Sequence, residues 1–291
     1  MRSGLVVVDK PAGWTSHDVV ARLRRVYGQR RVGHAGTLDP DATGVLLVGL
    51  GRVTRLLRFL QAAEKEYRAE VVFGVSTTTL DASGAVVEVR PMPVRRDDLV
   101  DATHRFLGDI EQVPPMVSAI KVGGRRLHQL ARAGETVERA PRSVRIRSID
   151  VESLVFGEHP VATIRVVCSS GTYIRSLAAD LGTALGGPAH LATLRRLRVG
   201  SFDEAAAVPL ARIEAVPECA LLTPADAMRD LERVVVDPEP ARAVAHGKPL
   251  PPPAAAGPGP FAVLDTAGEL LAVYERRGQA LRPVVVLGAG R

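Results

Sequence analysis

The 291-residue sequence has little of what marks secreted, metal-bound or membrane proteins. Its only two cysteines, Cys168 and Cys219, are far apart and form no metal-like pair, which is typical of a cytoplasmic chain with ordinary thiols. The longest apolar run, Val45–Leu50, is far shorter than the roughly 20 residues of a membrane helix. No charged-then-apolar leader follows Met1, so we expect no signal peptide and a cytoplasmic, membrane-free location.

The usual signatures of metal, nucleotide and hydrolase chemistry are also missing. The seven histidines include no pair at zinc-ligand spacing. Gly44 and Gly49 have the spacing of a phosphate-binding loop, but Leu50 and Gly51 stand where that loop needs Lys and Ser or Thr. There is no Gly-x-Ser-x-Gly elbow. We therefore expect neither a metal nor a cofactor.

The net positive charge of +6 comes entirely from the first three quarters of the chain. Residues 1–223 hold 30 basic and 24 acidic side chains, whereas residues 224–291 hold eight of each. Basic residues cluster in Arg22–Arg31, which contains no acid, and in Lys121–Arg147, which holds eight basic residues and two acidic ones. Two such clusters suit a polyanion such as RNA or DNA, and the alternative is a solvated basic face.

Strand and helix patterns alternate along the chain without a repeat and out of βαβ order, which indicates an α+β fold. Ser16 is expected to cap the first helix. A neutral, β-rich tail follows Thr223-Pro224, so we place a domain boundary near residues 224–232. The expected strands are Leu5–Val8, Tyr67–Phe73, Val86–Val89, Val144–Val155, Val161–Val167 and four short tail segments, and the expected helices are about His17–Tyr27, Arg96–Leu107 and Arg175–Leu185.

The segment Gly33–Gly44 is unusually rich in chemistry for a connecting loop. It contains three glycines, one His, two Asp and one Pro within twelve residues. On local pattern alone, Asp39 could be a helix N-cap with Pro40 as the first helical residue. His34 could equally be a hydrogen-bonded loop histidine.

The same segment closely resembles the catalytic motif of the TruB family of pseudouridine synthases. Further family-like motifs occur in the family's order, so that the resemblance spans about residues 4–200. One departure is that Thr77-Thr78-Thr79 stands where the family has Thr-Asp-Thr, which puts a loop contact at Thr78 in doubt. The other matching motifs are Leu5–Ser16, Lys65–Arg68, Asp81–Gly84, Gln112–Val122, Ser170–Arg175 and Leu194–Leu197.

The resemblance implies a pseudouridine-synthase fold with a central mixed, mainly antiparallel sheet. The catalytic domain would occupy residues 1–224, with an RNA-binding insertion at about 121–147. Residues 230–291 would form a small PUA-like RNA-binding domain. The implied reaction converts uridine to pseudouridine at position 55 in the tRNA T-loop, with tRNA as partner, no cofactor, and a monomer as the expected state.

The resemblance also carries roles to individual residues. Asp39 would be the catalytic carboxylate, and Arg175 the cation that keeps it ionised. Tyr67 would stack on the extruded uracil and take the proton from carbon 5. Residues that would contact the substrate are His34, Asp81, Tyr173, Leu197, Lys10, Arg125 and Arg126.

Each role has an ordinary structural alternative. Tyr67 could be an aromatic strand residue, Asp81 a turn cap, and Arg175 a surface charge at a helix start; Tyr173 and Leu197 could be core residues. Two other functions stay open: the catalytic subunit of an RNA-guided pseudouridine synthase, and an RNA-binding folding helper with secondary catalysis.

Overall fold

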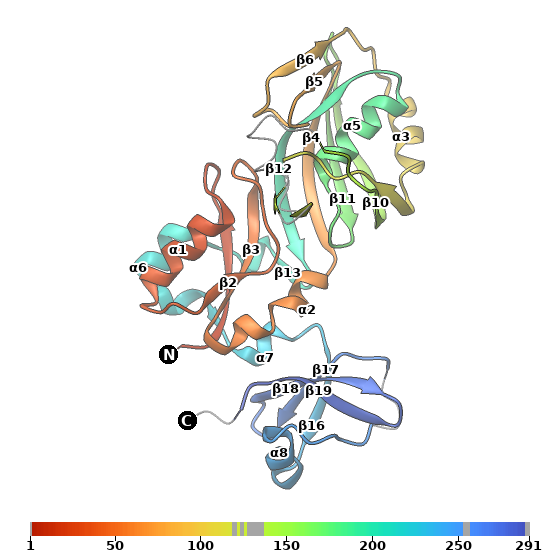
Figure 1. Cartoon of the computed structure of the whole chain (residues 1–291). Helices are drawn as coiled ribbons and strands as arrows, with labels where there is room; N and C mark the ends of the chain where they lie inside the picture. Colours follow the sequence, from red (N-terminus) through yellow and green to blue (C-terminus); the bar gives the residue numbers. More distant parts are fainter. Residues whose placement is uncertain (1, 118–120, 123–124, 127–136, 253–256, 289–291) are drawn as a thin grey trace. The chain divides into compact units, whose positions relative to one another are not determined.

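The computed structural model describes residues 2–117, 121–122, 125–126, 137–252 and 257–288 (Figure 1). The chain divides into two compact units. Unit 1 joins Met1–Ala62 to Val199–Arg291, and unit 2 is Ala63–Arg198. Both units combine helices with mainly antiparallel strands, so the expected α+β class is confirmed.

The first sheet of unit 1 is built around β1 (Gly4–Lys10), whose side chains are almost entirely buried. β1 pairs antiparallel with β3 (Thr43–Leu50), with Val8 opposite Leu46, and β3 pairs in turn with β2 (Val32–His34). Two short strands from later in the chain pair with the other edge of β1: β14 (Val208–Pro209) is parallel to it, and β15 (Leu221–Leu222) is antiparallel. This sheet holds the segment that contains Asp39, because that segment connects β2 to β3.

Helix α1 (Ser16–Val26) begins one residue earlier than expected. The N-cap is Thr15 and not Ser16: the Thr15 side chain accepts a hydrogen bond from the Asp18 N–H, and the Asp18 carboxylate accepts one from the Thr15 N–H. This reciprocal capping box satisfies two backbone donors at the helix start, and a single Ser cap would satisfy one. Ser16 is therefore free to make other contacts.

The neutral tail contains a separate four-stranded sheet with its own core. The strands run in the order β16 (Glu232–Val236), β17 (Phe261–Asp265), β18 (Leu270–Arg277) and β19 (Ala280–Val286). Helix α8 (Pro238–Ala245) contacts this sheet. The shared core includes Val244, Phe261, Tyr274 and Leu281.

Unit 2 contains the longest strands. β4 (Lys65–Phe73) pairs antiparallel with β11 (Val161–Cys168), β11 with β10 (Arg142–Val155), and β10 with β7 (Gly108–Gln112). β12 (Ala189–Val199) follows β4 on its other side, and β5 (Val75–Thr77) with β6 (Val86–Val89) forms a separate pair. The helices of this unit are α3 (Arg96–His104), which ends three residues earlier than expected, and α5 (Ile174–Ala184).

The remaining elements are short. They are η1 (Gly51–Arg55), α2 (Leu57–Ala62), β8 (Lys121–Val122), β9 (Arg125–Arg126), β13 (Phe202–Asp203), η2 (Glu204–Ala206), α6 (Leu210–Ala215), η3 (Pro217–Ala220) and α7 (Pro224–Ala227).

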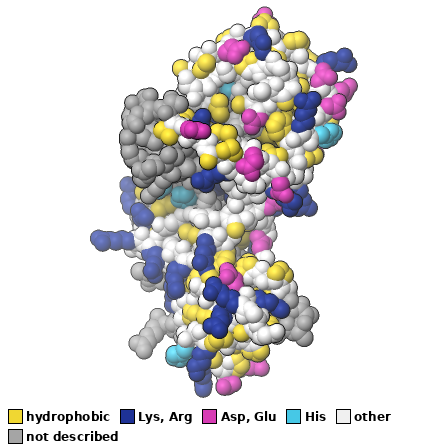
Figure 2. All heavy atoms as spheres, turned by 45° about the vertical axis from the view of Figure 1, so that its right-hand side comes forward, with side chains coloured by type: hydrophobic (Ala, Val, Ile, Leu, Met, Phe, Trp, Pro, Cys, Tyr) yellow, Lys and Arg dark blue, Asp and Glu magenta, His cyan; other side chains and the backbone are white. Residues whose placement is uncertain are grey.

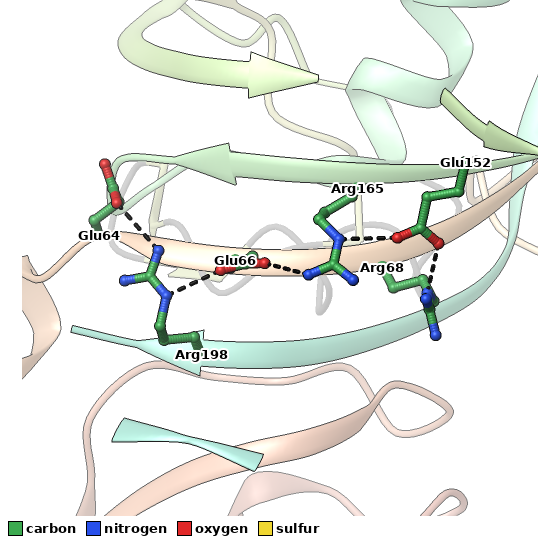
Figure 3. A network of polar contacts seen from close by, with 6 residues as sticks. All are labelled: Glu64, Glu66, Arg68, Glu152, Arg165 and Arg198. Atoms are coloured by element: carbon green, nitrogen blue, oxygen red, sulfur yellow. Dashed lines mark hydrogen bonds and ion pairs between the residues drawn. The ribbon is translucent and has the colours of Figure 1, made fainter. Parts of the chain in front are cut away.

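Alternation along β4 separates two chemically different faces of the unit 2 sheet. Lys65 and Tyr67 lie on the buried face, whereas Glu66 and Arg68 point to the opposite face. On that opposite face, three glutamates and three arginines, from neighbouring strands and from the residue before β4, form a chain of ion pairs with alternating charge (Figure 3). Its members are Glu64, Glu66, Arg68, Glu152, Arg165 and Arg198.

The shared carboxylates make this network sensitive to acid. Burial favours a higher pKa for Glu66, but hydrogen bonds from Arg198 and Arg165 outweigh it and hold that pKa below its usual value. The hydrogen bond from Arg68, aided by one from Arg165, lowers the pKa of Glu152. Because both pKa values are lower in the folded state, their stabilisation is present above the unfolded pKa of about 4.3 and is lost as the pH falls through the folded values.

We expect Glu66→Gln to lower the free energy of unfolding at pH 7 by about 1 kcal/mol, after allowance for the partly exposed arginines. The loss of stability between about pH 5 and pH 3 should also be shallower in this variant than in the wild type. Urea unfolding across that range measures both effects. Glu275→Gln is the control, because Glu275 faces Arg277 at 3.8 Å with both side chains exposed; an equal change of slope in the two variants would contradict a special role for the network.

Candidate functional site

Asp39 lies in the connection between β2 and β3, and no helix begins after it. The alternative interpretation of Asp39 as a helix N-cap is therefore wrong. The Asp39 carbonyl accepts a hydrogen bond from the Ala42 N–H at 3.2 Å, which closes a turn. Gly36 and Gly44, on either side of it, have φ values of +96° and +97°, a conformation that glycine adopts without a steric penalty.

Two buried side chains hold the backbone immediately before and after Asp39. The Ser16 hydroxyl accepts a hydrogen bond from the Leu38 N–H at 2.9 Å and donates to the Leu38 carbonyl at 3.2 Å. The Lys10 ammonium donates to the Pro40 carbonyl at 2.8 Å. Both flanks of the partly buried Asp39 are thus tied to the unit 1 framework.

Lys10 is completely buried. Besides Pro40, its ammonium donates to the carbonyls of Pro11 at 2.9 Å and Trp14 at 2.6 Å, so each of its three N–H groups has a backbone acceptor. The expectation that Lys10 contacts the substrate is untested, and this geometry favours a role in shaping the loop.

His34 is the last residue of β2 and is partly buried. Its ring meets the ring of His17, from the first turn of α1, edge to face, with centroids 5.3 Å apart and an interplanar angle of 81°. The first turn of α1 therefore contacts the candidate loop at two points, Leu38 and His34.

In unit 2, Tyr67 is buried on β4, with Lys65 two residues before it on the same face. Burial and the positive charge of Arg196 lower the pKa of Lys65 to about 8. Cys168 is opposite Lys65 in the strand register, and burial raises the pKa of its thiol to about 11. Tyr67 therefore shares the buried face of β4 with a lysine that loses its proton more easily than usual.

Arg175 is in the first turn of α5, with a side chain only 5% exposed, so it is not a surface charge. Its Nη1 lies 3.4 Å from Asp81 Oδ2 and donates to the Thr79 carbonyl at 3.2 Å, while Nη2 donates to the Val117 carbonyl at 2.8 Å. The guanidinium therefore joins α5 to the turn that carries Asp81.

Asp81 uses its two carboxylate oxygens differently. Oδ1 accepts hydrogen bonds from the Thr79 hydroxyl at 2.6 Å and from the Ser83 N–H at 3.1 Å, as a turn cap does, while Oδ2 faces Arg175. Thr78, at the position where the family has Asp, is exposed, and its N–H donates to the Ala85 carbonyl at 2.9 Å. The turn between β5 and β6 is thus closed by a backbone hydrogen bond at Thr78, the position where this sequence differs from the family.

Leu80, directly before Asp81, has a φ of +62°. Among the described residues, it is the one residue other than glycine with a positive φ. This region costs L-residues roughly 1–2 kcal/mol, and more when the side chain is β-branched. We expect Leu80→Ile to lower the free energy of unfolding by about 1–2 kcal/mol, although the side-chain volume is unchanged.

Leu80→Asn should be tolerated better than Leu80→Ile in the same urea titration, because Asn adopts positive φ more readily. Leu154→Ile in strand β10 is the control for the Leu-to-Ile change itself. Equal losses at Leu80 and Leu154 would show that the turn is not strained.

Tyr173 occupies the N-cap position of α5 without a capping hydrogen bond from its side chain, and the distant Gln112 amide holds its backbone. The Gln112 side chain accepts from the Tyr173 N–H at 2.7 Å and donates to the Tyr173 carbonyl at 3.0 Å. Leu197 lies buried on β12. The fold thus accounts for the position of both predicted pocket residues, and their contact with substrate remains a prediction.

The predicted site residues are divided between the two units. Unit 1 holds Lys10, His34 and Asp39, whereas unit 2 holds Tyr67, Asp81, Tyr173, Arg175 and Leu197. Within unit 2, Arg175 and Asp81 are brought together. The pairing of Asp39 with Arg175 joins residues of different units and remains a prediction.

The predicted RNA-binding insertion is described only in part. Arg125 and Arg126 form β9 opposite β8, while residues 123–124 and 127–136 lie outside the described residues. The arginine-rich segment around α1 is described, and there Arg22 pairs bidentately with Glu214, whereas Arg25 and Arg30 are exposed. Figure 2 shows Lys and Arg side chains gathered on the lower part of the face in view.

Sequence reasoning missed the individual contributions of Ser16, Gln112 and Thr79. The sequence predicts Ser16 as a helix cap and places Gln112 only at the start of a motif. Gln112 contacts Tyr173 across 61 positions, so no local pattern could have found it.

Within the described ranges, no group of three or more His, Cys, Asp or Glu residues is placed to hold a metal ion. Likewise, none of the described helices is long and apolar enough to cross a membrane.

Comparisons with known proteins identify the family of this chain. Residues 24–174 match the N-terminal domain of the TruB family pseudouridylate synthases, residues 175–241 match a tRNA pseudouridylate synthase B C-terminal domain, and residues 231–288 match a tRNA pseudouridine synthase II C-terminal domain. A Thermobifida fusca protein named tRNA pseudouridine synthase B is 49% identical over 98% of this chain and 99% of its own length. A protein of the same name from Mycobacterium sp. (strain KMS) is 47% identical, covering 98% of this chain and 96% of the relative.

Solved structures extend the similarity to the fold. An H/ACA RNP bound to a substrate RNA containing 2'-deoxyuridine has a chain that is 26% identical, with a TM-score of 0.74 over 98% of this chain and 84% of that chain. A Cbf5-Nop10-Gar1 complex has a chain that is 27% identical, with a TM-score of 0.76 and the same coverage. With family matches from residue 24 to residue 288 and near-full-length relatives at close to half identity, this chain belongs to the TruB family of pseudouridine synthases.

Proposed function

We propose that this protein converts uridine to pseudouridine at position 55 in the T-loop of tRNA, with Asp39 as the catalytic carboxylate. The reaction breaks the bond between uracil N1 and the ribose C1′, turns the base, and joins C5 to C1′. The proton on C5 is lost and N1 gains a proton, so the change is an isomerisation that needs no oxidant, reductant or group donor.

The observation that supports the tRNA substrate is the near-full-length similarity to proteins named tRNA pseudouridine synthase B. The observation that supports Asp39 is its setting: it caps no helix, yet Ser16 and Lys10 hold the backbone on both of its sides. A loop that only connected two strands would not need two buried polar side chains to define its path.

The three catalytic groups have complementary roles in this proposal. Asp39 acts at the glycosidic centre, as a nucleophile or as a proton-abstracting base. Arg175, already buried and fixed by Asp81 and two carbonyls, supplies the positive charge that favours the ionised form of a nearby carboxylate. Tyr67 stacks on the uracil and accepts the C5 proton.

The target base must leave its stack before any of these groups can reach it, at a cost of a few kcal/mol. His34 would help to hold the extruded nucleotide, Asp81 would contact the base edge, and Tyr173 and Leu197 would wall the pocket. Arg125 and Arg126 of the insertion would contact phosphates, so that RNA shape and charge dominate the binding.

Pseudouridine mapping tests the proposal directly. Purified protein and a bare tRNA transcript should yield pseudouridine at position 55, and a transcript with cytidine at that position should yield none. tRNA from cells that lack the gene should retain uridine there. Modification at other positions only, or only when a guide RNA is added, would overturn the proposal and favour an RNA-guided enzyme.

A further inference from the structure

We infer that Ser16 is a positioning residue for Asp39: its hydroxyl fixes the peptide that precedes the carboxylate and so sets where the carboxylate points. This inference rests on the proposed catalytic role of Asp39. It assigns to Ser16 a function in turnover beyond the stability of helix α1.

The first step is the pair of hydrogen bonds to one residue. The Ser16 hydroxyl accepts a hydrogen bond from the Leu38 N–H at 2.9 Å and donates one to the Leu38 carbonyl at 3.2 Å. One side chain thereby satisfies both backbone groups of Leu38, as a partner strand would. Ser16 is 1% exposed and Leu38 is 3% exposed, so water cannot substitute for the hydroxyl without a rearrangement.

The second step is that the Leu38 carbonyl belongs to the peptide plane that it shares with Asp39. A peptide unit is planar, so holding its oxygen also fixes the direction of the Asp39 N–H and limits the Asp39 Cα. On the other side, Lys10 holds the Pro40 carbonyl at 2.8 Å. The backbone is therefore held by hydrogen bonds on both sides of Asp39, at Leu38 and at Pro40. The Leu38 side depends on the Ser16 hydroxyl.

The third step is the rigidity of the element that carries Ser16. Thr15 and Asp18 form the capping box, with Thr15 Oγ1 accepting from the Asp18 N–H at 3.0 Å and the Asp18 carboxylate accepting from the Thr15 N–H at 2.9 Å. Because Thr15 performs the capping, the Ser16 hydroxyl is not needed at the helix end. Catalytic groups need placement to a fraction of an ångström, and a rigid, capped helix start can provide it.

The test is Ser16→Ala, which removes the hydroxyl alone. We expect the single-turnover rate to fall about 10- to 100-fold, the loss typical of a reacting group displaced by about 1 Å. The Kd for tRNA should change by less than about twofold, because phosphate contacts dominate binding. The measured rate is divided by the fraction of protein that is folded and binds tRNA, so that a partly unfolded sample is not mistaken for a slow enzyme.

Thr103→Val is the matched control. Thr103 is 2% exposed, and its hydroxyl donates to the Val100 carbonyl within α3 at 2.6 Å, so this variant also loses one buried hydroxyl. Its melting temperature should fall to a similar extent, with a wild-type rate. If Ser16→Ala does not fold, Ser16→Cys provides the measurement, since its thiol is somewhat larger, fills the space of the hydroxyl and forms only weak hydrogen bonds.

The outcomes separate the inference from the function on which it rests. A wild-type rate in Ser16→Ala or Ser16→Cys, alongside an inactive Asp39→Asn, would overturn the positioning role and leave the proposed function intact. A fully active Asp39→Asn would instead overturn the proposed catalytic role of Asp39, on which the inference rests. A reduced rate for Thr103→Val equal to that for Ser16→Ala would show a general stability effect and would also reject the positioning role.

Discussion

Asp39→Asn should reduce single-turnover pseudouridine formation to background, while tRNA binding stays within about twofold of wild type. The neutral amide can neither attack the glycosidic centre nor accept a proton there. The protein should be as stable as wild type or more so, because a partly buried charge is removed and functional sites often sacrifice stability. A chemical-quench assay, a filter-binding titration and a melting curve on one preparation measure the three properties.

Asp41→Asn is the control for this experiment, because Asp41 is exposed in the same loop. It should retain nearly full activity, which would show that neutralising an acid in the loop is not enough to stop turnover. Near-wild-type pseudouridine formation by Asp39→Asn would falsify the catalytic assignment, whatever the resemblance to relatives.

Arg175→Met should be the most destabilising of the changes considered, and it should also lower turnover by about 100- to 1,000-fold. It removes the partner of Asp81 and the donor to two backbone carbonyls, all in a nearly buried setting. We expect a loss of about 3 kcal/mol in the free energy of unfolding, at the low end for a broken buried pair because Asp81 is partly exposed. Urea unfolding and single-turnover kinetics provide the two measurements.

A second change separates the charge effect from the packing effect. Arg175→Met combined with Asp81→Asn leaves no unpaired carboxylate, so part of the lost stability should return. Arg277→Met, at an exposed ion pair, should cost less than about 0.5 kcal/mol. Additive losses in the double variant would mean that Arg175 and Asp81 do not interact energetically.

The three longest described helices, α1, α3 and α5, and long strands such as β4, β10 and β11 are predictable from the sequence because their apolar periodicity is local, whereas β12 and the shortest elements are not. The sequence also located the candidate loop, since glycine, proline and acidic residues in such density are recognisable without a structure. It was wrong about the first helix cap because Thr15 and Ser16 are adjacent and both are good caps. Only the reciprocal bonds between Thr15 and Asp18 distinguish them.

The environment of each charge could not be predicted in the same way. Arg175 has the local pattern of a charge at a helix start, yet its partners lie 94 positions before it in Asp81 and 58 positions before it in Val117. Lys10 is the last residue of β1, and the resemblance predicts it as a substrate contact, but three backbone carbonyls enclose its ammonium. Such burial depends on elements that meet only in the folded chain.

The division of unit 1 into two chain segments constrains how this protein is made. Its central strand β1 gains its partners β14 and β15 only from residues 208–222, after the whole of unit 2. At about 5–20 residues per second, a ribosome needs roughly 10–30 s to pass from residue 62 to residue 222. Unit 2 is contiguous and can fold during that interval, whereas β1 waits with one edge open. A nascent chain stalled before residue 208 should thus present to chaperones an apolar strand that is paired with β3 on one edge and open on the other.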